Sequence, residues 1–242
     1  MSSYDKNVNF WRRTKKTIQS DYICRPQAID LLSEVRGKRI IDIGCGDGYV
    51  SRILASRGAK ITAVDVSKGL ILSAINQETI DNLGIEYRIE SALDLKSVED
   101  ESFECAVSIM VFGHFNNNEM HQSLRETCRI LKSGGVFVLA VPHPAMYIAR
   151  LKTRWVEFNN QHPDYWGNED RLVLRTNDEQ EFSVVAKKHT LEEYLNGLIG
   201  CGFLIQEVSE PKANEDDMKE YSEMWGCEDK VPFYLVIKAT KK

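Results

Sequence analysis

Three glycines between a strand-like and a helix-like segment constrain the fold of this chain more than any other feature. Residues 38–43 form a short β-branched run, and Gly44, Gly46 and Gly48 follow it. Glycine is needed where the backbone takes a positive φ or must come close to a ligand. Apolar residues then recur at helical spacing over residues 48–57. The pattern predicts a strand, a tight turn and a helix.

Strand-like and helix-like segments go on alternating up to residue 141. Such alternation predicts a parallel sheet with right-handed crossovers, and sheets of this kind bind ligands at the carboxyl ends of their strands. The glycine turn is therefore the expected ligand site. Further strands are predicted at residues 59–64, 85–89, 103–109 and 136–141, and helices at 67–83, ended by Gly84, and at 118–131.

The alternation stops after Pro144. A stretch rich in aromatic and polar residues follows, and then two strand-like segments around a polar turn predict a hairpin. A threonine with a glutamate three residues later predicts a capped helix. The expected elements are the aromatic stretch 147–167, the hairpin 171–175 and 181–187, the helix capped by Thr190 and Glu193, strands 203–208 and 231–239, and an exposed acidic loop or short helix within 210–229.

Length and charge restrict the possible functions. The 242 residues suit one large α/β domain with insertions, and the net charge of −5 argues against a broad nucleic-acid-binding surface. The short basic cluster at residues 12–16 is predicted to be a solvated face. No apolar run approaches the roughly 20 residues that span a bilayer, and residues 1–13 do not read as a secretory signal. We expect a cytoplasmic monomer or homodimer that binds neither nucleic acid nor membrane.

Six cysteines are present and none forms a Cys-x-x-Cys pair, so we expect no zinc site and no other metal. Without a signal peptide, reduced thiols are expected. Cys105 and Cys201 have apolar neighbours and are predicted to be small core residues. The cysteines are Cys24, Cys45, Cys105, Cys128, Cys201 and Cys227.

Acidic residues near the glycine turn narrow the class of ligand. Tyr49 stands where a dinucleotide-binding turn needs its third glycine, and Asp42 precedes Gly44 by two residues. An acid there would repel a pyrophosphate but can hold an amine. Asp65 ends the second predicted strand and can accept hydrogen bonds from ribose hydroxyls, while Val66 can cover a purine. The pattern favours a cofactor with an amino-acid tail over NAD.

Four segments together resemble the motifs of one enzyme family, although each alone occurs in other parallel sheets. Ile40-Ile-Asp-Ile-Gly-Cys-Gly-Asp-Gly48 and Ala63-Val-Asp-Val-Ser67 look like the first two motifs of class I S-adenosylmethionine-dependent methyltransferases. Residues 103–108 and 129–135 resemble the fourth-strand motif and the turn before the fifth strand. The resemblance implies an α/β, Rossmann-like fold with a seven-stranded, mostly parallel sheet, flanking helices and an inserted cap after the fifth strand.

The resemblance also implies which residues hold S-adenosylmethionine and its product S-adenosylhomocysteine. Asp42 would lie near the amino group, and Asp65 would hold the ribose. Ile109 and Met110 would lie near the sulfonium. Ser91 stands where many members carry an acid for the adenine amino group. The predicted cofactor-binding residues are Asp42, Gly44, Cys45, Gly46, Asp65, Val66, Ala92, Leu93, Ile109 and Met110.

Methyl transfer from a sulfonium is an in-line displacement, so the protein mainly orients the reactants and excludes water. A base is needed only when the nucleophile must lose a proton. His143 and His114, near strand ends, are the candidate catalytic residues, followed by His189. His121 and His162 give no signal. Each candidate histidine has an alternative role as a hydrogen-bonded packing residue.

The acceptor is expected to be a small molecule that is methylated on oxygen or nitrogen, for example in secondary metabolism. Residues 109–112 lack the Asp/Asn-Pro-Pro-aromatic motif of many amino-methylating enzymes. A protein or RNA methyltransferase, or a non-catalytic nucleotide-binding module, remains an alternative. The cap aromatics could line an acceptor pocket or only pack on the sheet. The predicted acceptor contacts are Tyr22, His143, Tyr147, Trp155 and Trp166.

One methyltransferase domain is predicted over residues 1–242. Its predicted parts are N-terminal lid helices at 1–36, a cofactor-binding core at 37–144, an inserted acceptor cap at 145–189 and the C-terminal part of the sheet at 190–242.

Overall fold

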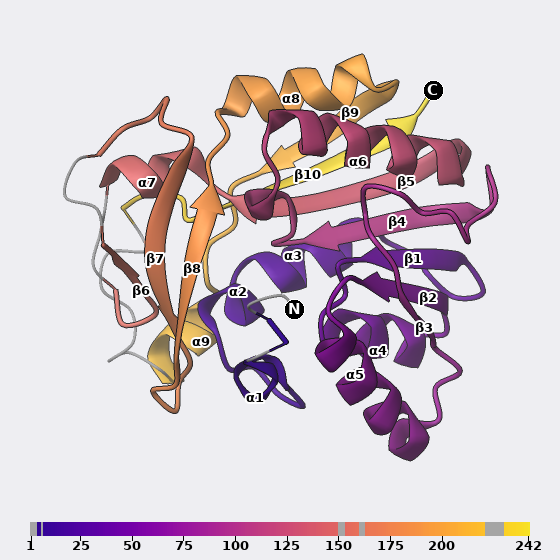
Figure 1. Cartoon of the computed structure of the whole chain (residues 1–242), viewed down its shortest axis with the longest axis horizontal. Coiled ribbons are helices and arrows are strands. Elements are labelled where there is room, and N and C mark those ends of the chain that lie inside the picture. Colours follow the sequence, from indigo (N-terminus) through magenta and orange to yellow (C-terminus); the bar gives the residue numbers. More distant parts are fainter. Residues whose placement is uncertain (1–3, 6, 150–152, 160–162, 221–229) are drawn as a thin grey trace.

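The computed structural model describes residues 4–5, 7–149, 153–159, 163–220 and 230–242. Its central sheet consists of β1 (Arg39–Ile43), β2 (Lys60–Asp65), β3 (Glu86–Ile89), β4 (Phe103–Ile109), β5 (Leu131–Pro142), β9 (Phe203–Ser209) and β10 (Tyr234–Lys241). The order is β3-β2-β1-β4-β5-β10-β9, and β10 runs antiparallel to both neighbours (Figure 1). The predicted α/β fold with a seven-stranded, mostly parallel sheet is confirmed.

The strand order places the glycine turn at a special point of the sheet. After β1 the chain adds β2 and β3 on one side, and then crosses to add β4 and β5 on the other. Ligands of open parallel sheets bind where the order reverses in this way, beyond the carboxyl ends of the strands. Because β1 ends at Ile43, the turn that follows it stands at this switch point.

Helices cover both faces of the sheet, and they are α3 (Cys24–Leu31), α4 (Tyr49–Ser56), α5 (Lys68–Asp81), α6 (Asn117–Ile130) and α8 (Leu191–Gly200). Ile40 packs in the core formed with α3 and α4. Ile41 and Ile43 belong to the opposite core, which includes residues of α6 and α8. The sheet is thus buried between two helical layers (Figure 1), as expected of parallel strands.

Helix ends follow local capping chemistry. The predicted capping box is present, because Thr190 Oγ1 accepts a hydrogen bond from Glu193 N at 3.1 Å, and the glutamate bonds back. One end was predicted wrongly. α5 stops at Asp81 and not at Leu83, since Asn82 takes a left-handed conformation with φ of +49° and ends the helix before Gly84.

Two strands differ from their predicted limits. β5 begins five residues earlier than the apolar run, because Leu131 already pairs with Phe103 of β4. β10 runs from Tyr234 to Lys241 rather than over 231–239. Its pairing with β9 continues as far as Lys241, which lies opposite Phe203. Pairing with a neighbour, and not hydrophobicity alone, sets both ends.

Between β5 and α8 the chain forms a separate small sheet with a short helix. Its elements are α7 (Pro144–Ala149), β6 (Val156–Phe158), β7 (Glu169–Arg175) and β8 (Glu181–Lys187). The three strands pair antiparallel in the order β6-β7-β8, so the predicted hairpin is confirmed. β6 was not predicted, since three residues are too few for a recognisable pattern.

The short helices α1 (Val8–Trp11), α2 (Gln19–Tyr22) and α9 (Glu215–Glu220) and the one-turn 3-10 helix η1 (Phe112–His114) complete the described elements. Figure 1 shows the N-terminal pair at the end of the central sheet where the small sheet stands. The rest of the predicted acidic loop, at 221–229, lies outside the described residues, as do Cys227 and His162. In the described parts of the chain, no helix is long and apolar enough to cross a membrane.

Candidate active site

The glycine turn accepts no side chain at two of its positions. Gly44 has φ of +74°, and a Cβ there would overlap Val111 of the loop after β4. Gly48 has φ of +79°, and a Cβ there would overlap the Tyr87 hydroxyl. Both residues must therefore be glycine for conformation and for space. Within the turn, Gly44 N donates to Val64 O at 2.8 Å, which ties the turn to β2.

Asp65 is fixed beside this turn by backbone hydrogen bonds. Its Oδ2 accepts from Gly46 N at 2.9 Å, and its Oδ1 accepts from Ser67 N at 2.8 Å. Burial raises the pKa of the Asp65 carboxyl, and these hydrogen bonds oppose the rise. These two backbone hydrogen bonds hold the carboxylate at the end of β2, beside the glycine turn.

Asp42 is buried below the turn. Its Oδ2 accepts from Ser51 Oγ at 2.6 Å, and its side chain is almost inaccessible to solvent. Burial raises the pKa of Asp42 to about 6, while Ser51 and the nearby Arg25 guanidinium lower it. Because the pKa of this buried carboxyl is raised, a cationic ligand beside it would stabilise its ionised form.

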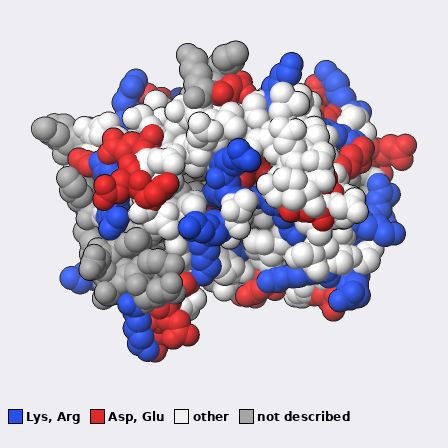
Figure 2. Space-filling view, turned by 90° about the horizontal axis from the view of Figure 1, so that it is seen from below, with Lys and Arg blue, Asp and Glu red and all other residues white. Residues whose placement is uncertain are grey.

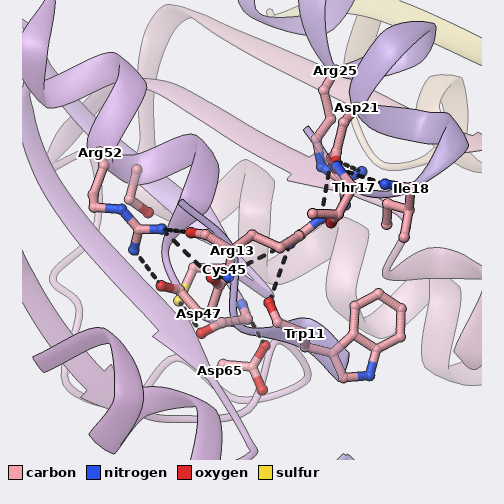
Figure 3. A network of polar contacts seen from close by, with 12 residues as sticks. Trp11, Arg13, Thr17, Ile18, Asp21, Arg25, Cys45, Asp47, Arg52 and Asp65 are labelled. Atoms are coloured by element: carbon pink, nitrogen blue, oxygen red, sulfur yellow. Dashed lines mark hydrogen bonds and ion pairs between the residues drawn. The ribbon is translucent and has the colours of Figure 1, made fainter. Parts of the chain in front are cut away.

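Buried arginines attach the N-terminal segment to the turn (Figure 3). Arg13 contacts Asp21 at 3.1 Å and Asp47 at 3.2 Å through its guanidinium, and its backbone N donates to Asp47 Oδ2 at 2.6 Å. Arg25 shares Asp21 at 2.9 Å. The guanidinium of Arg52 donates to the carbonyl oxygens of Asp47 and Arg13.

The prediction that residues 12–16 form a solvated face is therefore wrong for Arg13, which is 5% exposed. Arg13 and Arg25 both line the cavity at the turn, and sequence reasoning missed both. The partners are 8 and 34 residues away from Arg13, so no local spacing could have revealed them.

One cavity of about 410 Å³ joins the turn to the small sheet. At one end it is lined by all ten residues predicted to bind the cofactor: Asp42, Gly44, Cys45, Gly46, Asp65, Val66, Ala92, Leu93, Ile109 and Met110. At the other end it is lined by side chains that are mainly apolar, among them Ile18, Met146, Tyr147, Trp155, Leu172 and Val184.

The residues predicted to contact an acceptor are not all brought together. Tyr147 and Trp155 line the cavity and are buried. Tyr22 lies behind Trp155, with ring centroids 5.7 Å apart, and is absent from the lining. Trp166 is 82% exposed on the outer surface, so it does not reach the cavity.

The three candidate histidines also lie in different surroundings. His143 lies outside the cavity lining, because its Nδ1 accepts from Ala145 N at 3.0 Å and its Nε2 lies 2.9 Å from Glu210 Oε1. His189 Nε2 lies 2.8 Å from Phe115 O, so this ring has the role of a hydrogen-bonded packing residue. His114 does line the cavity, and its Nε2 is 2.7 Å from the Tyr4 hydroxyl. Burial lowers the pKa of His114 to about 4, so its ring is neutral at pH 7.

In the described residues no cluster of His, Cys, Asp and Glu could hold a metal ion. The described cysteines are free thiols: Cys24, Cys45 and Cys105 are buried, and Cys128 and Cys201 are half-buried.

Comparison with known proteins agrees with this geometry. Residues 41–139 match the family described as "Methyltransferase domain". An S-adenosylmethionine-dependent methyltransferase from Listeria monocytogenes has a similar structure, with a TM-score of 0.70, 25% identity, and 90% of this chain and 96% of that chain covered. One from Mesorhizobium loti gives a TM-score of 0.69 at 25% identity, covering 89% and 96%.

A curated relative is the ubiquinone biosynthesis O-methyltransferase of Xanthomonas oryzae pv. oryzae. It is 31% identical over 144 residues, which cover 53% of this chain and 59% of the relative. The chain thus spans little more than half the length of the curated relatives that it matches. The fold, the turn and these matches support a class I S-adenosylmethionine-dependent methyltransferase. S-adenosylmethionine is the cofactor of this family.

Proposed function

We propose that the chain transfers the methyl group of S-adenosylmethionine to an oxygen or nitrogen of a small molecule. The observation that carries the proposal is the single cavity that joins the glycine turn to the apolar side chains of the cap. The curated relative is an O-methyltransferase, which supports transfer to oxygen. Figure 2 shows acidic and basic side chains both present on one face, with no single-sign surface of the kind that nucleic acid prefers.

The residues at the turn fit the cofactor's chemistry. The buried Asp42, whose pKa is raised, can pair with the amino group, and Arg13 and Arg25 can face the carboxylate of the same amino-acid tail. Asp65 can accept from the ribose hydroxyls. Gly46, where a Cβ would meet nothing closer than Leu70 at 4.0 Å, leaves the backbone open to close approach. The bound sulfonium would supply an activated methyl group.

What the chain itself contributes is orientation and exclusion of water. The mainly apolar walls at the cap end of the cavity would hold the acceptor against the residues expected near the sulfonium, Ile109 and Met110. His114 is the candidate base, because it is the one of the three proposed histidines that lines the cavity. Its neutral ring can accept a proton from an acceptor hydroxyl.

The proposed function is tested by following a labelled methyl group. The full chain is incubated with S-adenosylmethionine tritiated in the methyl group, with a total metabolite extract, and separately with total protein or total RNA. Tritium should appear in the small-molecule fraction only. Label in RNA or protein instead would contradict the proposed acceptor class. Binding of the cofactor without any transfer would favour a non-catalytic module.

A further inference from the structure

The side chain of Tyr4 occupies part of the cavity between the cofactor end and the cap. Its hydroxyl lies 2.7 Å from His114 Nε2, and the two rings meet edge to face with centroids 5.4 Å apart. The phenol ring also packs at 5.4 Å from Trp11 and at 5.2 Å from Phe182 of β8. An aromatic hydroxyl of the chain itself is therefore bound on the candidate base.

The protonation states fix the direction of this hydrogen bond. Burial raises the pKa of the Tyr4 phenol, and the Asp65 carboxylate raises it further, so the phenol keeps its proton at pH 7. Burial lowers the pKa of His114 to about 4, so its ring is neutral. Tyr4 therefore donates and His114 Nε2 accepts, which is the arrangement an acceptor hydroxyl would need before methylation.

The place of Tyr4 is also where an acceptor would have to lie. Tyr4 lines the same cavity as Asp65 at the cofactor end, and its ring contacts Phe182 of the cap. His114 follows the loop that starts at Ile109 and Met110, the residues expected near the sulfonium. The phenol thus lies between the two ends of the cavity.

Among the described cap residues that line the cavity, no charged side chain is left to pair with an ionic acceptor. Arg175 is the charged residue among the described cap side chains that line the cavity, and its guanidinium already contacts Glu157 at 2.9 Å and Glu181 at 2.7 Å. The walls beside it include Leu172, Leu174 and Val184. A charge buried there would lack a partner, which is costly.

We propose that Tyr4 stands in for the acceptor in the ligand-free chain, so that the site takes a neutral aromatic hydroxyl compound, which replaces the Tyr4 phenol on His114. This inference rests on the proposed function. In the reaction the acceptor oxygen forms a bond to the methyl carbon while the carbon–sulfur bond breaks and its electron pair goes to sulfur. The hydroxyl proton passes to His114 Nε2 and from there to solvent.

The anchor that holds Tyr4 in place is its neighbour Asp5. Asp5 Oδ1 accepts from Ser67 Oγ at 2.7 Å and from Gly69 N at 3.0 Å, at the start of α5. Neither Asp5 nor Gly69 lines the cavity. The buried contacts of Arg13 lie further along the segment. Release of Tyr4 requires the loss of its own contacts with His114, Trp11 and Phe182, and the Asp5 contacts oppose that release from outside the cavity. Weakening the Asp5 contacts should therefore favour acceptor binding.

The test titrates 5-hydroxyindole calorimetrically into the full chain saturated with S-adenosylhomocysteine, with indole and indole-5-carboxylate as matched probes. We expect 5-hydroxyindole to bind about tenfold more tightly than either, because only it carries a neutral aromatic hydroxyl to replace the Tyr4 phenol on His114, whereas indole has only its ring N–H as a donor. Tyr4→Ala, which removes the competing ring, should tighten 5-hydroxyindole binding by about fivefold or more. Asp5→Asn should tighten it in the same direction while the cavity walls stay unchanged.

The inference is overturned if both variants leave 5-hydroxyindole binding unchanged or weaker, or if indole binds as tightly as 5-hydroxyindole. It is also overturned if Tyr4→Ala tightens S-adenosylhomocysteine alone, since Tyr4 would then occupy cofactor space. These results leave the proposed function intact, because the wild type still binds S-adenosylhomocysteine. A wild type that does not bind S-adenosylhomocysteine would refute the proposed function, and this inference with it.

Discussion

Single side chains in this molecule take their roles from their surroundings. His114 and His143 both follow the carboxyl end of a strand, and position in the sequence favoured His143, which directly follows β5. In the structure, His143 faces Glu210 while His114 faces the cavity. The two aspartates at the turn differ likewise: Asp65 is fixed by backbone N–H groups, and Asp42 is buried beside a serine.

The affinity for S-adenosylhomocysteine should fall as the pH decreases. The cofactor's ammonium pairs with ionised Asp42, whose pKa is about 6 in the ligand-free chain. From pH 7 to pH 5 the ionised fraction drops from about nine-tenths to about one-tenth, so affinity should fall by about tenfold. Asp65, whose pKa is also raised, acts in the same direction. Calorimetric titration at several pH values measures this, and Asp42→Asn should flatten the profile. A flat wild-type profile would exclude this role for Asp42.

Replacing Asp65 by asparagine should weaken S-adenosylhomocysteine binding by about 1.5–3 kcal/mol, because each lost charge-assisted hydrogen bond is worth about that much. Asparagine keeps one oxygen that can accept from Gly46 N, so the turn itself should survive. Titration of the variant checks the loss. The exposed Asp30→Asn is the matched control and should bind like the wild type. Unchanged affinity of the Asp65 variant would remove it from the site.

At the scale of elements, the strand–turn–helix unit and the N-terminal segment build the site together. The unit was predictable, since its glycines and acids are contiguous in the sequence. N-terminal lid helices were predicted, but the arginine contacts that attach this segment to the turn were not, because Arg13 reaches Asp47 across 34 residues. β6 escaped prediction for the same reason, since its three residues form a strand only by pairing with β7.

Two glycine-to-alanine substitutions at nearly the same backbone φ test the close contact between Gly44 and Val111. Gly44 and Gly134 have φ of +74° and +72°, but a Cβ at Gly44 would overlap Val111, whereas nothing lies within 4 Å of one at Gly134. Gly134→Ala should destabilise the fold by about 1–2 kcal/mol from the left-handed backbone alone. Gly44→Ala should cost about 1–3 kcal/mol more from the overlap. Chemical denaturation measures both, and equal losses would contradict the close contact.

The N-terminal segment should depend on Asp21. Its carboxylate contacts both Arg13 and Arg25, and all three side chains are buried. Asp21→Asn should destabilise the chain by about 3–5 kcal/mol, since it removes the carboxylate that pairs with the buried Arg25 and one of the two that pair with the buried Arg13. Lys16→Met is the control, because the Lys16–Asp217 pair is partly exposed and its loss should cost less than about 1 kcal/mol. Urea unfolding compares the two variants. A small loss for Asp21→Asn would mean that Asp47 alone holds Arg13.

Across the whole molecule, the alternating strands and helices determined the sheet, and the sheet determined where the cofactor end of the cavity lies. Strand periodicity and glycine chemistry are local properties, so the sequence alone predicted both. The acceptor end depends on which side chains of the cap, the N-terminal segment and the loop after β4 meet in space. Trp155 and Trp166 illustrate the limit: both are tryptophans of the same segment, and one is buried in the cavity wall while the other is 82% exposed.

The central claim is that the cavity at the glycine turn holds S-adenosylmethionine and not a dinucleotide. Calorimetric titration of the full chain with S-adenosylhomocysteine and with NAD tests it most directly. The geometry of Asp42 and Asp65 predicts that S-adenosylhomocysteine binds with one-to-one stoichiometry and that NAD gives no saturable signal. Saturable binding of NAD, with none of S-adenosylhomocysteine, would contradict the account.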